Sequence, residues 1–341
     1  MSQIAHARKL ISLVTPCFNE QENAAEFSLR IRALFENELR DFDYEHIWID
    51  NSSTDQTVAL VKQMCAKDPK IKLIVNQRNF GHIRSPYHGL LQASGDAVIC
   101  MASDLQDPLE LLPEFVKRWQ AGFQVVKGVK TASSESAMMF AVRGLYYALI
   151  GKLSDIELTK SFTGFGLYDK KVIDTLRKIN DPYRYFRGLI ADLGFTSSEV
   201  EFHQPTRKRG IKKINFLTLY DMAMLGITNH SKVPLRIATL SGFALGTLSL
   251  LVAIGYLVAK LIFLETFTFG TAPLIIGIFF FSSVQLFFIG ILGEYIGSIH
   301  TQVLKRPLVI ERERVNFHTA QPGPQHARVN AQEHDYEPRS H

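Results

Sequence analysis

Two long stretches without a charged side chain, Ile237–Ala259 and Thr266–Gly293, constrain most strongly what this chain can fold into. They are about 23 and about 28 residues long, and a helix of roughly 20 apolar residues crosses a hydrocarbon core of roughly 30 Å. Neither stretch shows the polar face that is typical of a helix on a globular domain. The sequence therefore predicts two membrane-spanning helices within residues 234–304.

The charges that flank these stretches predict their orientation. Lys232 and Arg236 precede the first stretch, and four basic residues between Lys305 and Arg314 follow the second. Since basic flanks stay on the cytoplasmic side, we expect a two-pass protein of the inner (plasma) membrane with both termini in the cytoplasm. The apolar run Leu10–Val14 is too short for the core of a secretory signal. The amino-terminal part is therefore also expected in the cytoplasm.

Ahead of the two stretches, short apolar runs alternate with segments of helical pattern. This alternation predicts an α/β domain over residues 1–233, with a mostly parallel, Rossmann-like sheet covered by helices. Residues 305–341 are expected to form a basic tail that is disordered beyond Phe317, because large apolar residues are scarce there. The expected strands are Leu10–Thr15, His46–Asp50, Ile71–Val75, Ala97–Met101 and Gln124–Gly128, and the main expected helices are Glu26–Leu39, Asp55–Ala66 and Leu109–Trp119.

Three further segments carry weaker helical signals. Ser85 followed by Pro86 is typical of a helix start and predicts a helix over Tyr87–Ala93. Ala137–Leu153 and Phe216–Ile227 are rich in large apolar residues. We interpret these two segments as helices in the membrane interface, the alternative being ordinary helices that face the core.

The net charge of +5 is concentrated in basic runs at Arg207–Lys213 and Lys305–Arg314. Clustered cations indicate an anionic partner. Because basic residues commonly border membrane spans, we expect membrane lipids and no nucleic acid. The three cysteines, Cys17, Cys65 and Cys100, are too far apart in sequence for a disulfide framework or a metal-binding motif, so they are expected to be buried apolar residues.

Carboxylates follow the expected strand Ala97–Met101 directly. Ligands bind at the carboxyl ends of strands in open α/β sheets, and Mg²⁺ is commonly held there by one or two carboxylates together with substrate phosphates. We therefore interpret Asp104 as a metal ligand in a site for a phosphate-bearing substrate. Asp107 fits a helix cap, with Pro108 at the first helical position and Glu110 closing a capping box.

Four motifs, each at the end of an expected strand, occur together: Pro16-Cys17-Phe18-Asn19-Glu20, Asp50-Asn51-Ser52-Ser53-Thr54-Asp55, Arg78-Asn79-Phe80-Gly81 and Asp104-Leu105-Gln106-Asp107-Pro108. With them, the chain resembles family 2 glycosyltransferases of the polyprenyl-phosphate type, the group of dolichol-phosphate mannose synthases and bacterial undecaprenyl-phosphate sugar transferases. The resemblance runs from about Ser12 to Pro307, and the ending matches at Gly290–Tyr295 and Lys305–Leu308.

This resemblance implies a GT-A domain that moves a sugar, with inversion, from a nucleotide-sugar to a polyprenyl (undecaprenyl) phosphate for cell-envelope polysaccharide or lipid modification. It also implies a divalent cation, Mg²⁺ or Mn²⁺, and suggests a homo-oligomer. An acceptor phosphate is already largely ionised at neutral pH, so no strong base is required, and His82 and His88 are taken as structural or surface residues. By similarity, the donor-binding residues are Pro16, Asn19, Glu20, Asp50, Arg78, Asn79 and Ser103; the metal ligands are Asp104 and Gln106; the catalytic carboxylates are Asp104 and Asp107; and Arg207 and Lys213 bind phosphate, anionic lipid headgroups being the alternative.

The chain departs from the family pattern inside the expected site. Ala102 replaces the first metal-binding carboxylate, Asn51 the second of two aspartates, and Ser52 a glycine. Gly164 and Gly166 replace an acid and a cation near the expected acceptor phosphate. These changes fit a transferase with another donor or acceptor, such as a lipid-linked saccharide, or a degenerate, non-catalytic membrane scaffold.

Overall fold

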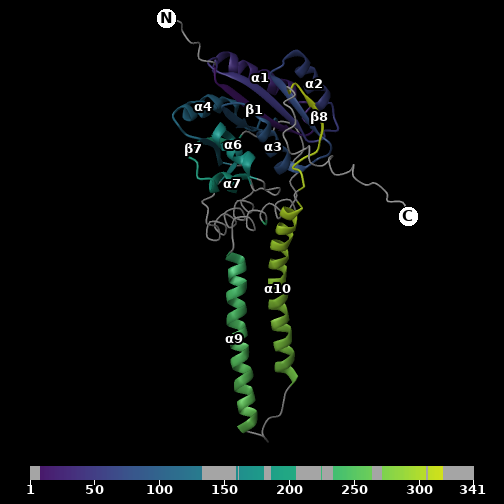
Figure 1. The fold of residues 1–341 in the computed structure, drawn as a ribbon, viewed down its shortest axis with the longest axis vertical. Coiled ribbons are helices and arrows are strands. Elements are labelled where there is room, and N and C mark those ends of the chain that lie inside the picture. Colours follow the sequence, from purple (N-terminus) through teal and green to yellow (C-terminus); the bar gives the residue numbers. More distant parts are fainter. Residues whose placement is uncertain are drawn as a thin grey trace, which may run out of the picture.

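The computed structural model describes residues 8–132, 161–179, 186–204, 233–262, 271–304 and 306–317, together with Thr159 and Met224. Figure 1 shows an α/β domain from which two long helices, α9 (Val233–Ile262) and α10 (Thr271–Val303), extend side by side. The segments expected at the membrane interface, Ala137–Leu153 and Phe216–Ile227, lie outside the described residues apart from Met224, as does the tail beyond Phe317.

An eight-stranded sheet, in the order β7-β5-β6-β4-β1-β2-β3-β8, forms the centre of the α/β domain. The pairs β4–β1, β1–β2, β2–β3 and β5–β7 are parallel, whereas β6 and β8 run antiparallel to their neighbours. The predicted GT-A-like, mostly parallel sheet is thus confirmed. The strands are β1 (Leu10–Cys17), β2 (Asp43–Asp50), β3 (Ile71–Asn76), β4 (Ala97–Cys100), β5 (Val125–Ala132), β6 (Phe162–Asp169), β7 (Ser197–His203) and β8 (Glu311–Val315).

Helices cover both faces of the sheet and bury an apolar cluster on each. On one face, Phe27, Val61 and Phe115 from α1, α2 and α4 pack in one cluster with Trp48 of β2. On the other face, α3, α6 and α7 pack in a second cluster that includes Ile49 of the same strand. The helices are α1 (Ala24–Asn37), α2 (Thr57–Lys67), α3 (Gly81–Gln92), α4 (Leu112–Gln120), α6 (Lys170–Lys178) and α7 (Phe186–Asp192), with a 3-10 turn, η1, at Leu109–Leu111.

The helix predicted from Ser85 and Pro86 begins earlier, at Gly81, so that Pro86 lies inside α3. The Asn79 side chain accepts a hydrogen bond from the Gly81 N–H at 2.8 Å, and this contact sits where the helix starts. Ser85 does not cap the helix, because its hydroxyl instead accepts from Asn76 Nδ2 of β3 at 3.0 Å. The expected cap was therefore wrong.

The tail expected over residues 305–341 contains a strand of the folded domain. β8 pairs antiparallel with β3 at the edge of the sheet, with Val315 opposite Leu73 and Arg314 opposite Ile74. Its sequence, Glu-Arg-Glu-Arg-Val, is dominated by charges, which suits an edge strand but lacks the apolar pattern from which strands are predicted. The prediction of a basic tail over residues 305–341 therefore missed a strand of the folded domain.

The two long helices expose large apolar side chains, among them Leu240, Phe243 and Leu286 at 69%, 72% and 68% exposure. Among the described residues, one stretch, Phe280–Val303, is long and apolar enough to cross a membrane, and Val233–Ser249 forms a shorter apolar helix. Continuous apolar surface of this kind marks a face that contacts lipid or another protein.

Candidate functional site

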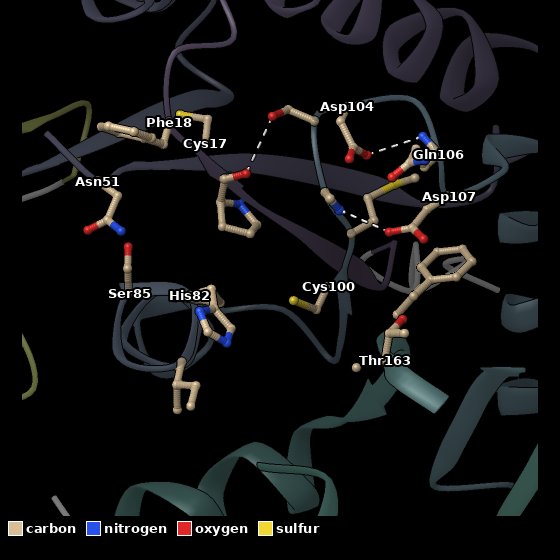
Figure 2. Close-up of a pocket in the computed structure, with 18 of the residues that line it drawn as sticks. Cys17, Phe18, Asn51, His82, Ser85, Cys100, Asp104, Gln106, Asp107 and Thr163 are labelled. Carbon is tan, nitrogen blue, oxygen red and sulfur yellow. Dashed lines mark hydrogen bonds between the residues drawn. The ribbon is translucent and has the colours of Figure 1, made fainter. Parts of the chain in front are cut away.

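A cavity of about 640 Å³ opens where the carboxyl ends of β1 and β4 meet the start of α3 (Figure 2). The parallel register places Cys17 of β1 beside Asp50 of β2 and Val14 beside Cys100 of β4, so the loops after these strands converge. This edge of a parallel sheet is where open α/β folds bind ligands. Most of the predicted site residues line the cavity: Pro16, Asn19, Glu20, Asn79, Ser103, Asp104, Gln106 and Asp107.

The loop after β4 brings Asp104 to the cavity wall. Asp104 Oδ1 accepts a hydrogen bond from the Gln106 N–H at 3.2 Å, and Ser103 Oγ donates to the Pro16 carbonyl at 3.4 Å (Figure 2). Leu105, between Asp104 and Gln106, has a φ of 57°, in the left-handed region, and this conformation turns the loop sharply. Asp104 is thereby held at the cavity while remaining partly exposed.

Asp107 is buried on the same loop, and its carboxylate accepts a hydrogen bond from the Ala102 N–H at 3.1 Å. It caps no helix: the turn η1 begins after Pro108 without a side-chain cap, so the capping interpretation was wrong. Burial raises the pKa of Asp107 to about 6, against the lowering effect of the bond from Ala102, and the nearby charge of Asp104 raises it further. A carboxylate with such a pKa can take up a proton near neutral pH.

The side chains that could hold a divalent cation lie on one wall of the cavity. In the part of the chain that the structure describes, no three His, Cys, Asp or Glu side chains gather closely enough to hold a metal ion. Asp104 and Gln106 both line the cavity, and Ala102 beside them offers no side-chain oxygen. Since Mg²⁺ commonly takes one or two protein carboxylates and completes its shell with water and phosphate oxygens, these residues fit a cation shared with a substrate.

Asp50 lies beneath the cavity and does not line it. The side chain is fully buried, and it accepts hydrogen bonds from both the backbone N–H, at 2.9 Å, and the hydroxyl of Ser53. Ser53 Oγ in turn accepts from the Asn19 N–H at 2.9 Å. Asp50 is therefore placed to hold the loop that carries Asn19. Burial raises the pKa of Asp50, and the bonds from Ser53 counter that effect.

Arg78 also lies outside the cavity lining. Its guanidinium sits 4.2 Å from the centre of the Phe80 ring and donates to the Asn79 carbonyl at 3.0 Å. These contacts stabilise the loop before α3. Arg207 and Lys213, predicted to bind phosphate, lie outside the described residues.

Asn51 lines the cavity although sequence reasoning treated it only as a lost aspartate. Its Nδ2 donates to Asn79 Oδ1 at 2.9 Å and to the Gly81 carbonyl at 3.1 Å, while its Oδ1 accepts from the Phe80 N–H at 2.8 Å. Asn51 thus ties the loop after β2 to the start of α3. Its position next to Asp50 in a strand-end motif was the signal that could have identified it.

Two cations and a histidine from other elements also line the cavity: Lys130 of β5, Arg187 of α7 and His82 of α3. Burial, followed by the charge of Arg187, lowers the pKa of His82, so the ring is neutral at physiological pH. Lys130 lies near enough to Asp107 to lower the pKa of that carboxyl. No motif in the sequence marks Lys130 or Arg187, because segments distant in the chain bring them together.

Residues 12–176 match the family model described as glycosyl transferase family 2. The SfII prophage-derived bactoprenol glucosyl transferase of Shigella flexneri is 32% identical over 301 residues, which is 88% of this chain and 96% of that protein. The prophage bactoprenol glucosyl transferase homolog of Escherichia coli (strain K12) is 31% identical over 306 residues, 88% of this chain and 97% of that protein. Among solved structures, mannosyltransferase PcManGT from Pyrobaculum calidifontis has a TM-score of 0.40 at 14% identity, covering 88% of this chain and 89% of that one, a likeness too weak to bear on function.

Proposed function

Because this chain belongs to glycosyl transferase family 2 and is a glycosyltransferase, we propose that it transfers a sugar from a nucleotide-sugar to a polyprenyl phosphate, undecaprenyl phosphate in bacteria. One observation carries this proposal: a cavity at the carboxyl ends of parallel strands has Asp104 and Asp107 on its wall, in a chain similar to bactoprenol glucosyl transferases over most of its length. The product would serve the cell envelope, in a polysaccharide or a lipid modification.

The donor occupies the cavity, whose volume of about 640 Å³ lies within the range of small-molecule sites. Its base and ribose lie against Pro16, Asn19 and Glu20, with Asn51 and Asn79 on the neighbouring loop. Its diphosphate lies near Ser103 and Asp104. Asp50 contributes by holding the loop of Asn19 through Ser53, as the hydrogen bonds among these residues support.

Charge on the departing nucleoside diphosphate must be stabilised as the bond to the sugar breaks. A Mg²⁺ or Mn²⁺ ion, held by Asp104 and Gln106 and shared with the diphosphate, would supply positive charge when bound. Lys130 and Arg187 add fixed cations at the cavity. Arg207 and Lys213 are proposed to bind the phosphates of the donor or the anionic headgroups of lipids.

The acceptor needs little activation. An ionised phosphate oxygen of the lipid attacks the anomeric carbon from the side opposite the diphosphate, so the new carbon–oxygen bond forms with inversion as the nucleoside diphosphate leaves. Orientation of the two substrates then supplies most of the acceleration. Asp107, with a pKa of about 6, can take the remaining proton of an acceptor that arrives as the monoanion.

The acceptor has to reach the cavity from a bilayer. We propose that α9 and α10 both cross the membrane, and that residues 1–233 together with β8 form the cytoplasmic domain at the inner leaflet. The exposed apolar side chains on both helices, the long stretch Phe280–Val303 and the basic flanks support this two-pass arrangement. Packing of these helices between copies would give a homo-oligomer.

Incubation of the purified full-length protein with undecaprenyl phosphate and a panel of nucleotide-sugars, with and without Mg²⁺ or Mn²⁺, tests the proposal. Mass spectrometry should detect one glycolipid that depends on the cation, and Asp104→Asn should abolish it while leaving the circular-dichroism spectrum unchanged. No product with any donor would overturn the proposed reaction.

A further inference from the structure

After α10 the chain returns to the sheet, and hydrogen bonds hold it there both before and after β8. Only residues 304–310 separate the last residue of α10 from the first residue of β8. The Gln77 N–H donates to the Ile310 carbonyl at 2.8 Å, and Asn316 Nδ2 donates to the carbonyls of Cys65 and Ile71 at 2.7 and 2.8 Å. The end of α10 is therefore tied to β3 and α2 by a short connection.

A β-bulge places the side chains of Glu311 and Glu313, two acidic residues of β8, on opposite faces of the sheet. Glu313 lies opposite Val75 and Glu311 opposite Asn76, so Arg312 is the extra residue. A bulge of this kind redirects the side chains on either side of it. Glu313 Oε2 accordingly lies 2.6 Å from Lys62 Nζ of α2, whereas Glu311 points to α3.

Glu311 makes the principal contact between β8 and α3. His88 Nε2 lies 2.6 Å from Glu311 Oε1, and both side chains are mostly buried, at 16% and 22% exposure. Arg314 Nε donates to the same carboxylate at 2.8 Å, and Arg314 also donates to Gln92 of α3 at 2.9 Å. Although burial opposes ionisation, the hydrogen bonds from His88 and Arg314 lower the pKa of Glu311 to about 2, so the carboxylate stays charged.

The same helix forms a wall of the cavity. His82, Ile83 and Pro86 line the cavity, while His88 contacts β8. A packed helix moves as a unit, so a displacement of α3 on the side that contacts β8 also moves the side that lines the cavity. Tyr87 fixes α3 to α6 through a hydrogen bond to the Leu176 carbonyl at 3.1 Å. Helix α3 therefore connects the strand that follows α10 with the site.

We propose that β8 is a positioning strand. Through the contact between His88 and Glu311 it holds α3 at a fixed position relative to the last residue of α10. The cavity wall that α3 forms is thereby held in place as well. The proposal rests on the proposed function. It assigns His88 and Glu311 as positioning residues for the lipid acceptor, which arrives along the apolar helices. The loops after β1 and β4, which supply donor contacts, follow strands that do not pair with β8.

The test compares Glu311→Ala with the matched variant Glu313→Ala, which removes a contact of equal length on the opposite face of the same strand. The full-length protein in phospholipid vesicles is assayed with undecaprenyl phosphate and, separately, with a short isoprenyl phosphate that stays in water. We expect Glu311→Ala to raise KM for undecaprenyl phosphate about fivefold or more, as for a typical coupling between sites. The donor Kd and the reaction with the water-soluble acceptor stay unchanged, and Glu313→Ala behaves as the parent.

His88→Ala provides a second variant that leaves β8 itself intact. It should reproduce the KM effect, and the double variant His88→Ala/Glu311→Ala should be no worse than Glu311→Ala alone, because both changes remove the contact between His88 and Glu311. Hydrogen exchange over Gly81–Gln92 should accelerate in all three variants and not in Glu313→Ala.

Equal effects of Glu311→Ala and Glu313→Ala would overturn the proposal, since they would show a merely structural strand. Unchanged KM in Glu311→Ala and His88→Ala, or a parallel loss with the water-soluble acceptor, would overturn it as well. If the parent protein forms no glycolipid, the proposed function fails instead. The exchange measurement still tests the link between β8 and α3 in that case.

Discussion

Replacing Asp107 by Asn should stabilise the protein above pH 6 and slow transfer to an acceptor that arrives as the monoanion. The carboxyl is 9% exposed, and burial raises its pKa from 3.8 to about 6 against the hydrogen bond from Ala102. That difference corresponds to about 3 kcal/mol of unfolding free energy. Asn keeps an oxygen that can accept from the Ala102 N–H but carries no charge, so this cost disappears in the variant.

The sign of the pH dependence follows from the raised pKa. Below pH 3.8 the carboxyl is protonated in both the folded and the unfolded chain, and its full contribution to stability is present. As pH rises through about 6, the Asp107 carboxyl ionises more readily in the unfolded chain than in the folded one, so its contribution to stability is lost. The two proteins should therefore differ little in stability near pH 4 and most above pH 7.

Scanning fluorimetry in detergent from pH 4 to 8 measures this difference. If local relaxation recovers half of the cost, the gain is about 1.5 kcal/mol, which corresponds to a rise in Tm of about 3–6 °C for an α/β domain of roughly 150–250 residues. Asp104→Asn is the matched control, because that carboxylate is partly exposed on the same loop; it should lose turnover without this gain. Equal melting of Asp107→Asn and the parent at pH 7.5 would refute the assignment of a raised pKa to burial.

Three further changes probe the site and its frame. Ser52→Gly should raise the free energy of unfolding by about 1 kcal/mol in urea denaturation, because Ser52 has a φ of 68°, which costs a non-glycine residue about that much; an unchanged midpoint would contradict this. Gly166→Ala should lower stability by about 1–3 kcal/mol, since its Cβ would meet the Val126 carbonyl oxygen at 2.4 Å, and a stability equal to the parent's would show that β5 can yield. Arg187→Gln should lower kcat about tenfold in steady-state assays, the size of one charge-assisted hydrogen bond to the departing diphosphate; an effect on KM for the acceptor phosphate alone would assign Arg187 to the acceptor instead.

The first four strands could be predicted because their residues are buried on both faces and form nearly continuous apolar runs, as in Ile11–Val14 and Ile47–Ile49. β8 could not, because it has one apolar residue in five and its pairing with β3 depends on a partner far away in the chain. The start of α3 was misplaced for a related reason. Ser85 and Pro86 carry a local start signal, but the hydrogen bonds of Asn79 and Ser85 to neighbouring segments override it.

The strand-end motifs predicted most of the cavity lining, because the carboxyl ends of parallel strands meet at one edge whatever the details of the loops. Two aspartates that both belong to strand-end motifs differ in burial. Asp104 reaches the cavity wall, whereas Asp50 lies beneath it and bonds to Ser53. Lys130 and Arg187 came from segments without a motif, and only the folded chain brings them to the wall.

The place of β8 at the edge of the sheet has a consequence for biosynthesis. A ribosome releases β3 long before it reaches β8, so the nascent domain carries an unpaired row of backbone N–H and C=O groups while α9 and α10 are still being made. Open edges of this kind recruit other chains and aggregate. A fragment cut after residue 233 would keep this edge of β3 unpaired, and the α/β domain completes its sheet only after translation has passed α10.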